Sequence, residues 1–299
     1  MSLKRIVIKI GTNVLQQDNG KLDYKLISAL TSQIVKIRSL GHEVLLVSSG
    51  SIGAGRELCS VDESVNTLVS HQILASVGQA KLIQIYSDSF RKHKTTVAQI
   101  LLTRGDFSLR KSYLNIRNTL ENLLKYRIIP IVNENDVVST EELDLNFGDN
   151  DLLAVYLATL IGADQLFFLT VAPGLIKEEE TGQGIQSKIV AQVEKLTEEI
   201  IQHCLPYTSA GGKGGMESKV RSAGMAMSFG IDTYIIDGKY PAGVLKILEG
   251  NLLGTHFVAH GRKIRSYQKW LAAGALNKGT LIIDQGAEQA LLKNKKSLL

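Results

Sequence analysis

Residues 5–47 read RIVIKIGTNVLQQDNGKLDYKLISALTSQIVKIRSLGHEVLLV and contain one complete strand–helix–strand pattern. Arg5–Ile10 is a short apolar run rich in β-branched residues, which predicts a buried strand. Tyr24–Leu40 carries apolar residues at helical spacing and ends before Gly41, a residue type that commonly follows a helix. Glu43–Val47 predicts the second strand. A helix between two buried strands is the unit from which parallel sheets are built.

The same alternation continues along the chain. Further strands are predicted at Thr96–Leu102, Ile128–Val132, Gln165–Leu169, Thr233–Ile236 and His256–Val258. Further helices are predicted at Val65–Phe90, Tyr113–Tyr126, Asp151–Ile161, Met216–Phe229 and Ala242–Leu248. This pattern predicts an α/β protein with a mostly parallel sheet covered by helices on both faces. Two polar segments interrupt it: we expect a small hairpin at Glu141–Leu145 and a mobile surface loop at Lys177–Gln186.

Composition limits the possible function classes. The chain has 299 residues, 44% hydrophobic and 21% charged, as is ordinary for a globular protein with a substantial core. Its net charge of +5 comes from scattered basic residues, so we expect no nucleic-acid partner. Cys59 and Cys204 match no metal or redox spacing, which indicates a reducing compartment. Because no run resembles a signal peptide or a membrane span, we expect a cytoplasmic protein without membrane association.

Five polar, glycine-bearing segments stand close to the ends of apolar runs. They are Ile6–Leu15, Leu45–Gly55, Ile129–Val138, Asn146–Leu153 and Ser209–Lys219. Ligands of parallel sheets collect at the carboxyl ends of the strands. The five segments are therefore expected to meet at one site.

Each segment has a functional and a plainer interpretation. Lys9, just before Gly11, can reach a phosphate, but a solvated lysine at a strand end fits equally well. Ser48–Gly55 suits an anion held by backbone amides, or a tight turn that needs glycine. Asn133–Asp136 follows a strand that should be buried, where four polar side chains pack poorly, and this favours a site.

The last two segments each open a helix. In Asp149–Asp151 one carboxylate would satisfy the helix cap, which leaves the other to orient a cation, a lysine or a substrate ammonium. In Gly211–Lys219 the glycines expose backbone donors before a helix, which favours a phosphate cradle over a flexible linker. Several other chemistries are excluded, because the chain has no P-loop pattern, no H-E-x-x-H, no G-x-S-x-G and no cysteine–histidine pattern.

Ten segments, taken in order, resemble the amino acid kinase family, and within it the glutamate 5-kinases. They are VIKIGTNVL, VSSGSIGAGR, ASVGQAKLIQIY, AQILLTR, YLNIR, IPIVNENDVV, FGDNDLLA, GADQLFFLT, GGMESKV and GIDTYIIDG. The resemblance implies a three-layer αβα sandwich with an open, mostly parallel sheet. It also implies Mg²⁺- and ATP-dependent phosphorylation of the γ-carboxylate of L-glutamate, the first step of proline biosynthesis. Proline as feedback inhibitor and a homo-oligomer, dimer or tetramer, are implied as well.

The resemblance also implies roles for matching positions. Lys9 and Lys219 would neutralise the transferring phosphoryl group, and Asp151 would hold both lysines. Glutamate would be bound by Ser49, Gly50, Asn133, Asp136, Asp149 and Asn150. ATP would be bound by Lys9, Gly11, Thr170, Val171, Lys213, Gly214, Gly215, Met216, Glu217, Ser218 and Lys219. No protein ligand for a metal is expected, because the phosphates of ATP would hold most of the Mg²⁺.

Three features depart from the family pattern. Val171 stands where relatives usually have aspartate, and Lys213 stands where they often have a small hydroxyl residue. The third is length: we expect a catalytic domain at residues 1–260, followed at 261–299 by a connector and the truncated start of a PUA-like region. Two alternatives stay open. One is a related phosphotransferase acting on N-acetylglutamate, aspartate or a nucleoside monophosphate. The other is a catalytically weak sensor of nucleotide or proline.

Overall fold

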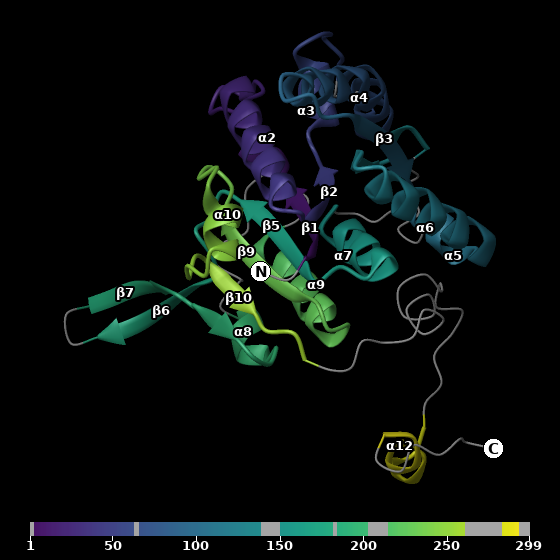
Figure 1. The fold of residues 1–299 in the computed structure, drawn as a ribbon. Coiled ribbons are helices and arrows are strands. Elements are labelled where there is room, and N and C mark those ends of the chain that lie inside the picture. The colour runs from purple at the N-terminus through teal and green to yellow at the C-terminus, as the bar shows by residue number, and fades with distance from the viewer. Residues whose placement is uncertain are drawn as a thin grey trace.

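A computed structural model of the chain (Figure 1) describes residues 3–62, 66–138, 150–181, 184–202, 215–260 and 283–292. Its centre is an eight-stranded sheet in the order β3-β4-β2-β1-β5-β9-β10-β8. The strands are β1 (Arg5–Ile10), β2 (Glu43–Ser48), β3 (Val97–Leu102), β4 (Ile129–Glu134), β5 (Gln165–Thr170), β8 (Gln192–Val193), β9 (Asp232–Asp237) and β10 (Thr255–Phe257). Every pairing in this sheet is parallel except that of β9 with β10. The predicted mostly parallel sheet is confirmed.

Helices cover both faces of the sheet, as the sequence predicted (Figure 1). They include α1 (Thr12–Leu15), α2 (Tyr24–Ser39), α3 (Ser51–Arg56), α4 (Thr67–Arg91), α6 (Arg110–Lys125), α7 (Asn150–Ile161), α9 (Met216–Ser228) and α10 (Gly243–Leu248). Shorter elements are the helices α5 (Arg104–Ser108) and α8 (Glu198–Gln202), the 3₁₀ turn η1 (Asp136–Val138) and the separate helix α12 (Gln285–Leu292). Of the helices with six residues or fewer, α10 was predicted, at Ala242–Leu248, whereas α1, α3, α5 and α8 were not, because so short a segment shows little periodicity.

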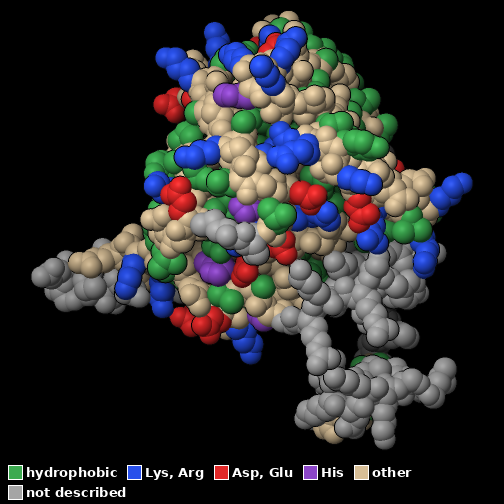
Figure 2. Space-filling model, viewed as in Figure 1, with side chains coloured by type: hydrophobic (Ala, Val, Ile, Leu, Met, Phe, Trp, Pro, Cys, Tyr) green, Lys and Arg blue, Asp and Glu red, His purple; other side chains and the backbone are tan. Residues whose placement is uncertain are grey.

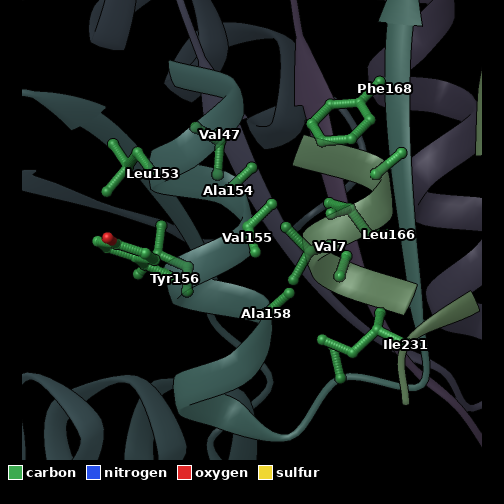
Figure 3. Packing of buried hydrophobic residues seen from close by; sticks show 14 of the residues in the cluster. Val7, Val47, Leu153, Ala154, Val155, Tyr156, Ala158, Leu166, Phe168 and Ile231 are labelled. Atoms are coloured by element: carbon green, nitrogen blue, oxygen red, sulfur yellow. The ribbon is translucent and has the colours of Figure 1, made fainter. Parts of the chain in front are cut away.

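The two faces of the sheet build two separate apolar clusters. Side chains alternate along a strand, so Val7 of β1 packs in one cluster while Ile6 and Ile8 pack in the other. Figure 3 shows part of the first cluster, where Val7 points toward Val155 and Ala158 of α7. Lys9 is two residues beyond Val7 and therefore belongs to the face that α7 covers. The alternation of β1 thus aims one lysine into the layer of α7 and α9.

Helix α7 is buried on almost every side. Of its residues, only Asn150 and Leu152 are not fully buried. A helix that is apolar all round belongs inside a protein. Helix α7 packs on the central strands of the sheet and also contacts the helices α9 and α6. This packing carries the one carboxylate of α7, Asp151, into the interior.

Strand β1 marks the point where the direction of the chain across the sheet reverses. Its two neighbours, β2 and β5, both run parallel to it, and the chain visits them on opposite sides. The pairing continues just past the strand ends, since Gly11 N donates to Leu169 O at 3.2 Å and Ser49 N to Ile10 O at 3.2 Å. At such a point the loops beyond the strands separate and leave a crevice, which is where open α/β sheets bind ligands.

One predicted loop is wrong. Lys177–Gln186 forms most of an antiparallel hairpin of β6 (Ile176–Thr181) and β7 (Gly184–Ile189), which extends away from the main sheet in Figure 1. The register runs from Ile176 opposite Ile189 to Thr181 opposite Gly184, so two residues connect the strands. A ribbon outside the core needs backbone pairing and a short turn rather than an apolar face, so hydrophobic periodicity gave no signal for it.

The hairpin expected at Glu141–Leu145 lies outside the described residues. Within the described ranges, no helix combines the length and the apolar character that a membrane span requires.

Candidate active site

An ion-paired cluster lies at the carboxyl end of β1. Nζ of Lys9 is 2.5 Å from Oδ1 of Asp151, and Nζ of Lys219 is 3.1 Å from Oδ2 of the same carboxylate. The side chains of Lys9 and Lys219 are only 4% and 10% exposed, and that of Asp151 is completely buried. The structure therefore brings together the three residues that the sequence placed in catalysis.

Three elements position this cluster. Lys9 comes from β1, Asp151 from the first turn of α7, and Lys219 from the first turn of α9, whose preceding residue is Gly215. A carboxylate in the first turn of a helix interacts favourably with the positive end of the helix dipole. Two ammonium groups and one carboxylate sum to +2 − 1 = +1, so these three groups retain one positive charge. A buried cluster of that sign is suited to an anionic ligand.

A network of amide side chains lies at the ends of the neighbouring strands. Nδ2 of Asn150 donates to Oγ of Ser49 at 2.8 Å and to Oδ1 of Asn133 at 2.9 Å. Nδ2 of Asn133 in turn donates to Oε1 of Gln79 at 2.9 Å. Oδ1 of Asn150 is buried and has no hydrogen-bond partner among the described residues. A buried acceptor without a donor is unusual, and a ligand's donor group would satisfy it.

The turn after β2 depends on glycine. Gly50 has a φ of 109°, a left-handed conformation, and a Cβ there would lie 3.3 Å from a methyl group of Leu15. The next residue, Ser51, donates from Oγ to Oδ2 of Asp136 at 3.0 Å. This bond ties the turn to η1 and places the half-buried Asp136 beside the loop that carries Ser49 and Gly50.

A second set of hydrogen bonds, made by Ser48 and Tyr86, supports the same turn. Oγ of Ser48 lies 2.8 Å from the hydroxyl of Tyr86 and donates to the backbone oxygen of Ser49 at 3.0 Å. Complete burial raises the pKa of Tyr86 to about 12, and the bond to Ser48 acts in the opposite direction. Tyr86 therefore stays protonated at any physiological pH and keeps its hydroxyl hydrogen available for this chain.

Of the residues expected to bind the nucleotide, Lys9, Gly11, Thr170, Val171 and Gly215–Lys219 are among the described residues. Thr170 ends β5, and its backbone oxygen accepts from Gly238 N at 2.7 Å, while Val171 beyond it is 52% exposed. Gly215–Lys219 begins α9, where the side chain of Met216 is buried in the core. Met216 can therefore offer a ligand only its backbone. Glu217 pairs with Arg221 along the helix.

Some expected site residues lie outside the described part of the chain: Asp149, Lys213 and Gly214. Conversely, sequence reasoning did not single out Gln79 or Tyr86, and it named Ser48 and Ser51 only as part of the segment Ser48–Gly55. Gln79 and Tyr86 stand inside a segment that carried the family resemblance, ASVGQAKLIQIY, but no spacing rule connects them to a site. Only the folded chain does, because Gln79 and its partner Asn133 are 54 residues apart.

Comparison with known proteins shows the family of this chain. The profile of the amino acid kinase family matches residues 4–237. A glutamate 5-kinase from Dehalococcoides mccartyi (strain CBDB1) is 41% identical over 297 residues, covering 99% of this chain and 79% of the relative. A glutamate 5-kinase from Nostoc punctiforme is 39% identical over 99% of this chain and 80% of the relative.

Two solved structures share the fold at low sequence identity. A UMP kinase from Bacillus anthracis has a TM-score of 0.58 at 14% identity, covering 87% of this chain and 98% of its own. A carbamate kinase from Giardia lamblia bound to AMP-PNP has a TM-score of 0.59 at 19% identity, covering 87% of this chain and 99% of its own. The family profile and the relatives together show that this chain belongs to the amino acid kinase family and, within it, to the glutamate 5-kinases.

Proposed function

We propose that this chain transfers the γ-phosphoryl group of ATP to the γ-carboxylate of L-glutamate and so forms L-glutamyl 5-phosphate, the first step of proline biosynthesis. The single observation that carries the proposal is the buried cluster of Lys9, Asp151 and Lys219 at the carboxyl end of β1, in a chain about 40% identical to glutamate 5-kinases. A new bond forms between a carboxylate oxygen and the γ-phosphorus. The bond between that phosphorus and the β–γ bridging oxygen breaks, and ADP leaves.

The residues suit this reaction because phosphoryl transfer depends on positioning and charge stabilisation. A carboxylate is already an anionic nucleophile, so no general base is needed. Lys9 and Lys219 would approach the oxygens of the transferring group from two elements, and Asp151 would hold both ammonium groups in place. Charges fixed in a buried site stabilise developing charge without reorganising during the reaction.

Substrate recognition would fall to the amide network and the acidic loop. Ser49 and Gly50 follow β2, Asn133 lies near the end of β4, and Asn150 begins α7. These four would contact the substrate, and Asp136 and Asp149 would supply the charge that an α-ammonium requires. An acetylated amino acid lacks that ammonium, which favours L-glutamate over N-acetylglutamate. Gly11, Thr170, Val171 and the segment from Lys213 to Lys219 would hold ATP.

Magnesium would enter with the nucleotide. Among the described residues, no three histidine, cysteine, aspartate or glutamate side chains gather into a metal-binding group, and Asp151 is paired with two lysines. We propose that the ATP phosphates hold most of the Mg²⁺, where the ion neutralises phosphate charge. The lysines remain the protein's own contribution. Proline inhibition, a homo-oligomer and a cytoplasmic location are proposed from the family alone.

The competing functions are distinguished by substrate. Another phosphotransferase of the family would prefer N-acetylglutamate, aspartate or a nucleoside monophosphate. A sensor of nucleotide or proline would bind without turnover, and it would have no need of all three members of the ion-paired cluster.

The test is ATP-dependent formation of an acyl phosphate, trapped with hydroxylamine in the presence of Mg²⁺. L-Glutamate, N-acetyl-L-glutamate and L-aspartate are compared, and ADP release is followed for UMP. Hydroxamate formed chiefly from L-glutamate is the expected result. Preference for another acceptor would reassign the substrate, and no turnover by folded protein with any acceptor would leave the sensor.

A further inference from the structure

Helix α4 is held against the site by an unusually close backbone contact. A Cβ on Gly78 would overlap the backbone oxygen of Ser51 and the backbone nitrogen of Gly55, both in α3. A Cβ on Gly55 would likewise overlap the backbone of Leu74 in α4. Only helices whose backbones meet directly leave so little room. The contact at Gly78, one residue before Gln79, therefore fixes how α4 is shifted along its axis and rotated about it relative to α3.

Gln79 points from α4 to the end of β4. Its Oε1 accepts a hydrogen bond from Nδ2 of Asn133 at 2.9 Å, and the contact bridges two elements. Asn133 is only 2% exposed, so both ends of its amide need partners within the protein. The backbone N–H of Glu134 donates to Oδ1 of Asn133 at 2.9 Å. Gln79 supplies the matching acceptor at the other end.

This pairing determines how the next amide is presented. An asparagine amide has one oxygen that accepts and one nitrogen that donates two hydrogens. Since Oδ1 of Asn133 faces Asn150, Asn150 must turn its Nδ2 toward Asn133, and Ser49 Oγ takes the second hydrogen. Both donors of Asn150 are then used. Its Oδ1 remains buried without a partner among the described residues.

We propose that Gln79 is a positioning residue for the amino-acid substrate. It holds Asn133, and through Asn133 it holds Asn150, in the orientation that leaves Oδ1 of Asn150 as an acceptor for a donor group of that substrate. The proposal rests on the proposed function, because the substrate that benefits is the acceptor amino acid. Gln79 itself contacts Asn133, whereas the lysine cluster is held by other residues, so its effect belongs to substrate binding and not to the transfer step.

The decisive variant removes the acceptor while keeping the shape. Gln79→Met has an unbranched side chain of similar length and no strong acceptor, so Nδ2 of Asn133 is left buried and unpaired. We expect KM for L-glutamate to rise about tenfold, the usual effect of one unsatisfied buried group. The kcat and the KM for ATP should stay within about twofold. Gln79→Glu retains an acceptor for Nδ2 of Asn133 and should restore most of the lost affinity.

Two controls separate positioning from a loss of structure. Gln84→Met makes the same substitution on an exposed position of the same helix and should leave every constant unchanged. In a double-mutant cycle, Gln79→Met added to Asn133→Ala should raise KM no further, since Gln79 acts through Asn133. Additive effects, or an equal loss of kcat and of affinity for ATP, would overturn the proposal.

A readout without substrate distinguishes a failure of this proposal from a failure of the proposed function. In ¹H–¹⁵N spectra of the ligand-free protein, the side-chain NH₂ signals of Asn133 and Asn150 should both move in Gln79→Met and neither should move in Gln84→Met. If the wild type forms no hydroxamate from L-glutamate, the proposed function fails. The NH₂ signals then decide by themselves whether Gln79 orients the two amides. Unmoved Asn150 signals would show that Gln79 does not orient that amide, whatever the substrate is.

Discussion

At the scale of single residues, the site depends on one carboxylate shared by two lysines. Burying charges is costly, and a buried ion pair is held only if geometry and partners compensate the lost hydration. Asp151 achieves this by facing Lys9 and Lys219 with different oxygens. The cost of keeping two ammonium groups out of water is understandable if their charge is needed by a ligand.

Lys9→Ala tests that need. Removal of one charge contact made in the transition state should lower kcat by about 10²-fold or more, with a smaller effect on KM for L-glutamate. The measurement is steady-state hydroxamate formation. Lys246→Ala is the matched control, because Lys246 is half exposed and pairs with Glu249 at the surface. A Lys9 variant within a few-fold of wild-type kcat would exclude Lys9 from the transfer step.

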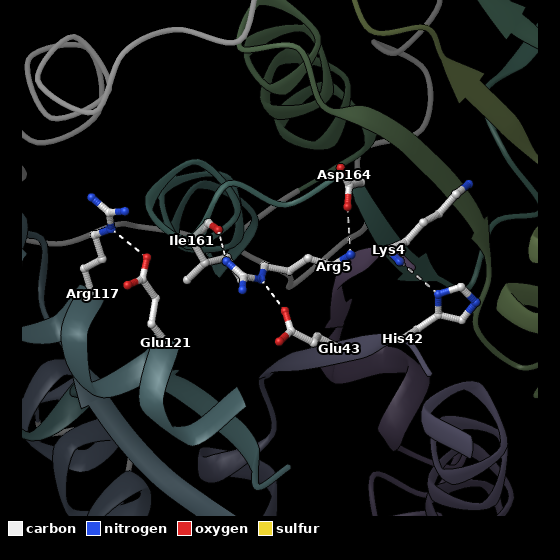
Figure 4. Close-up of polar contacts among 8 residues, drawn as sticks. All are labelled: Lys4, Arg5, His42, Glu43, Arg117, Glu121, Ile161 and Asp164. Carbon is white, nitrogen blue, oxygen red and sulfur yellow. Dashed lines mark hydrogen bonds and ion pairs between the residues drawn. The ribbon is translucent and has the colours of Figure 1, made fainter. Parts of the chain in front are cut away.

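His42 directly precedes β2, so it lies at the opposite end of the strands from the ion-paired cluster. It makes the stability of the fold depend on pH. Its Nδ1 accepts from the backbone nitrogen of Lys4 at 3.1 Å, as Figure 4 shows. Burial, and then the positive charge of Lys4, lower its pKa below the ordinary value of 6.5. Below pH 6.5 the unfolded chain therefore binds a proton that the folded chain rejects, so stability falls as the pH falls through that window.

The His42→Asn variant should remove this dependence. Asparagine keeps an acceptor for Lys4 but does not titrate. Urea unfolding midpoints measured between pH 7.5 and 5.5 should fall less in His42→Asn than in the wild type. His93→Asn, at an exposed histidine, should follow the wild type. Parallel curves for wild type and His42→Asn would contradict the assignment.

At the scale of elements, the contact between α3 and α4 leaves no room for a side chain at Gly78. Gly78→Ala would place a methyl group into the backbone of α3, and backbone cannot move as a side chain can. We expect a loss of at least about 1–3 kcal/mol of unfolding free energy, measured by urea denaturation. KM for L-glutamate should rise too, because Gln79 moves with its neighbour.

Gly224→Ala is the matched control for that prediction. It is also a glycine inside a helix, but its added Cβ meets the end of the Leu196 side chain, which can turn away. Alanine favours a helix by about 1 kcal/mol over glycine, so this variant should be near neutral or slightly stabilised. Equal stability of Gly78→Ala and Gly224→Ala would show that the close approach of α3 and α4 does not exclude a side chain at position 78.

The sequence predicted the large elements and missed those that depend on contacts across the chain. The strands β1, β2 and β5 are buried apolar runs, and their patterns are visible in isolation. The hairpin of β6 and β7 is polar, and no local pattern separates it from a loop. The same division holds in the site. Lys9, Asp151 and Lys219 follow from motifs, but the bond between Gln79 and Asn133 joins α4 to β4, and only the packing of α4 brings them together.

At the scale of the whole molecule, the fold concentrates its chemistry at one edge. Figure 2 shows lysine and arginine side chains spread over the viewed face with acidic groups among them, so on that face no single charged patch stands out. The charges that matter to the proposed reaction are instead buried, at the carboxyl end of β1 where β2 and β5 diverge. The eight-stranded sheet places residues from three distant segments there.

The buried core indicates how far the folding unit extends along the chain. Every fully buried hydrophobic side chain among the described residues lies between Ile6 and Phe257, and the last backbone tie runs from His260 N to Met227 O at 3.2 Å. We therefore expect residues 1–260 to form the catalytic domain on their own. A chain ending at His260 should melt within about 3 °C of the full chain, since a loss of 1 kcal/mol shifts Tm by roughly 2–4 °C at this size.

Thermal melting and hydroxamate kinetics of nested truncations check this boundary. A chain ending at Leu292 removes only the basic tail and serves as the control. Unchanged melting and an unchanged KM for L-glutamate in the shorter chain would place the boundary near His260, as expected. A large fall in Tm for the shorter chain alone would show that residues 261–292 pack on the catalytic core. A loss of kcat at constant Tm would instead mean that this region completes the active site.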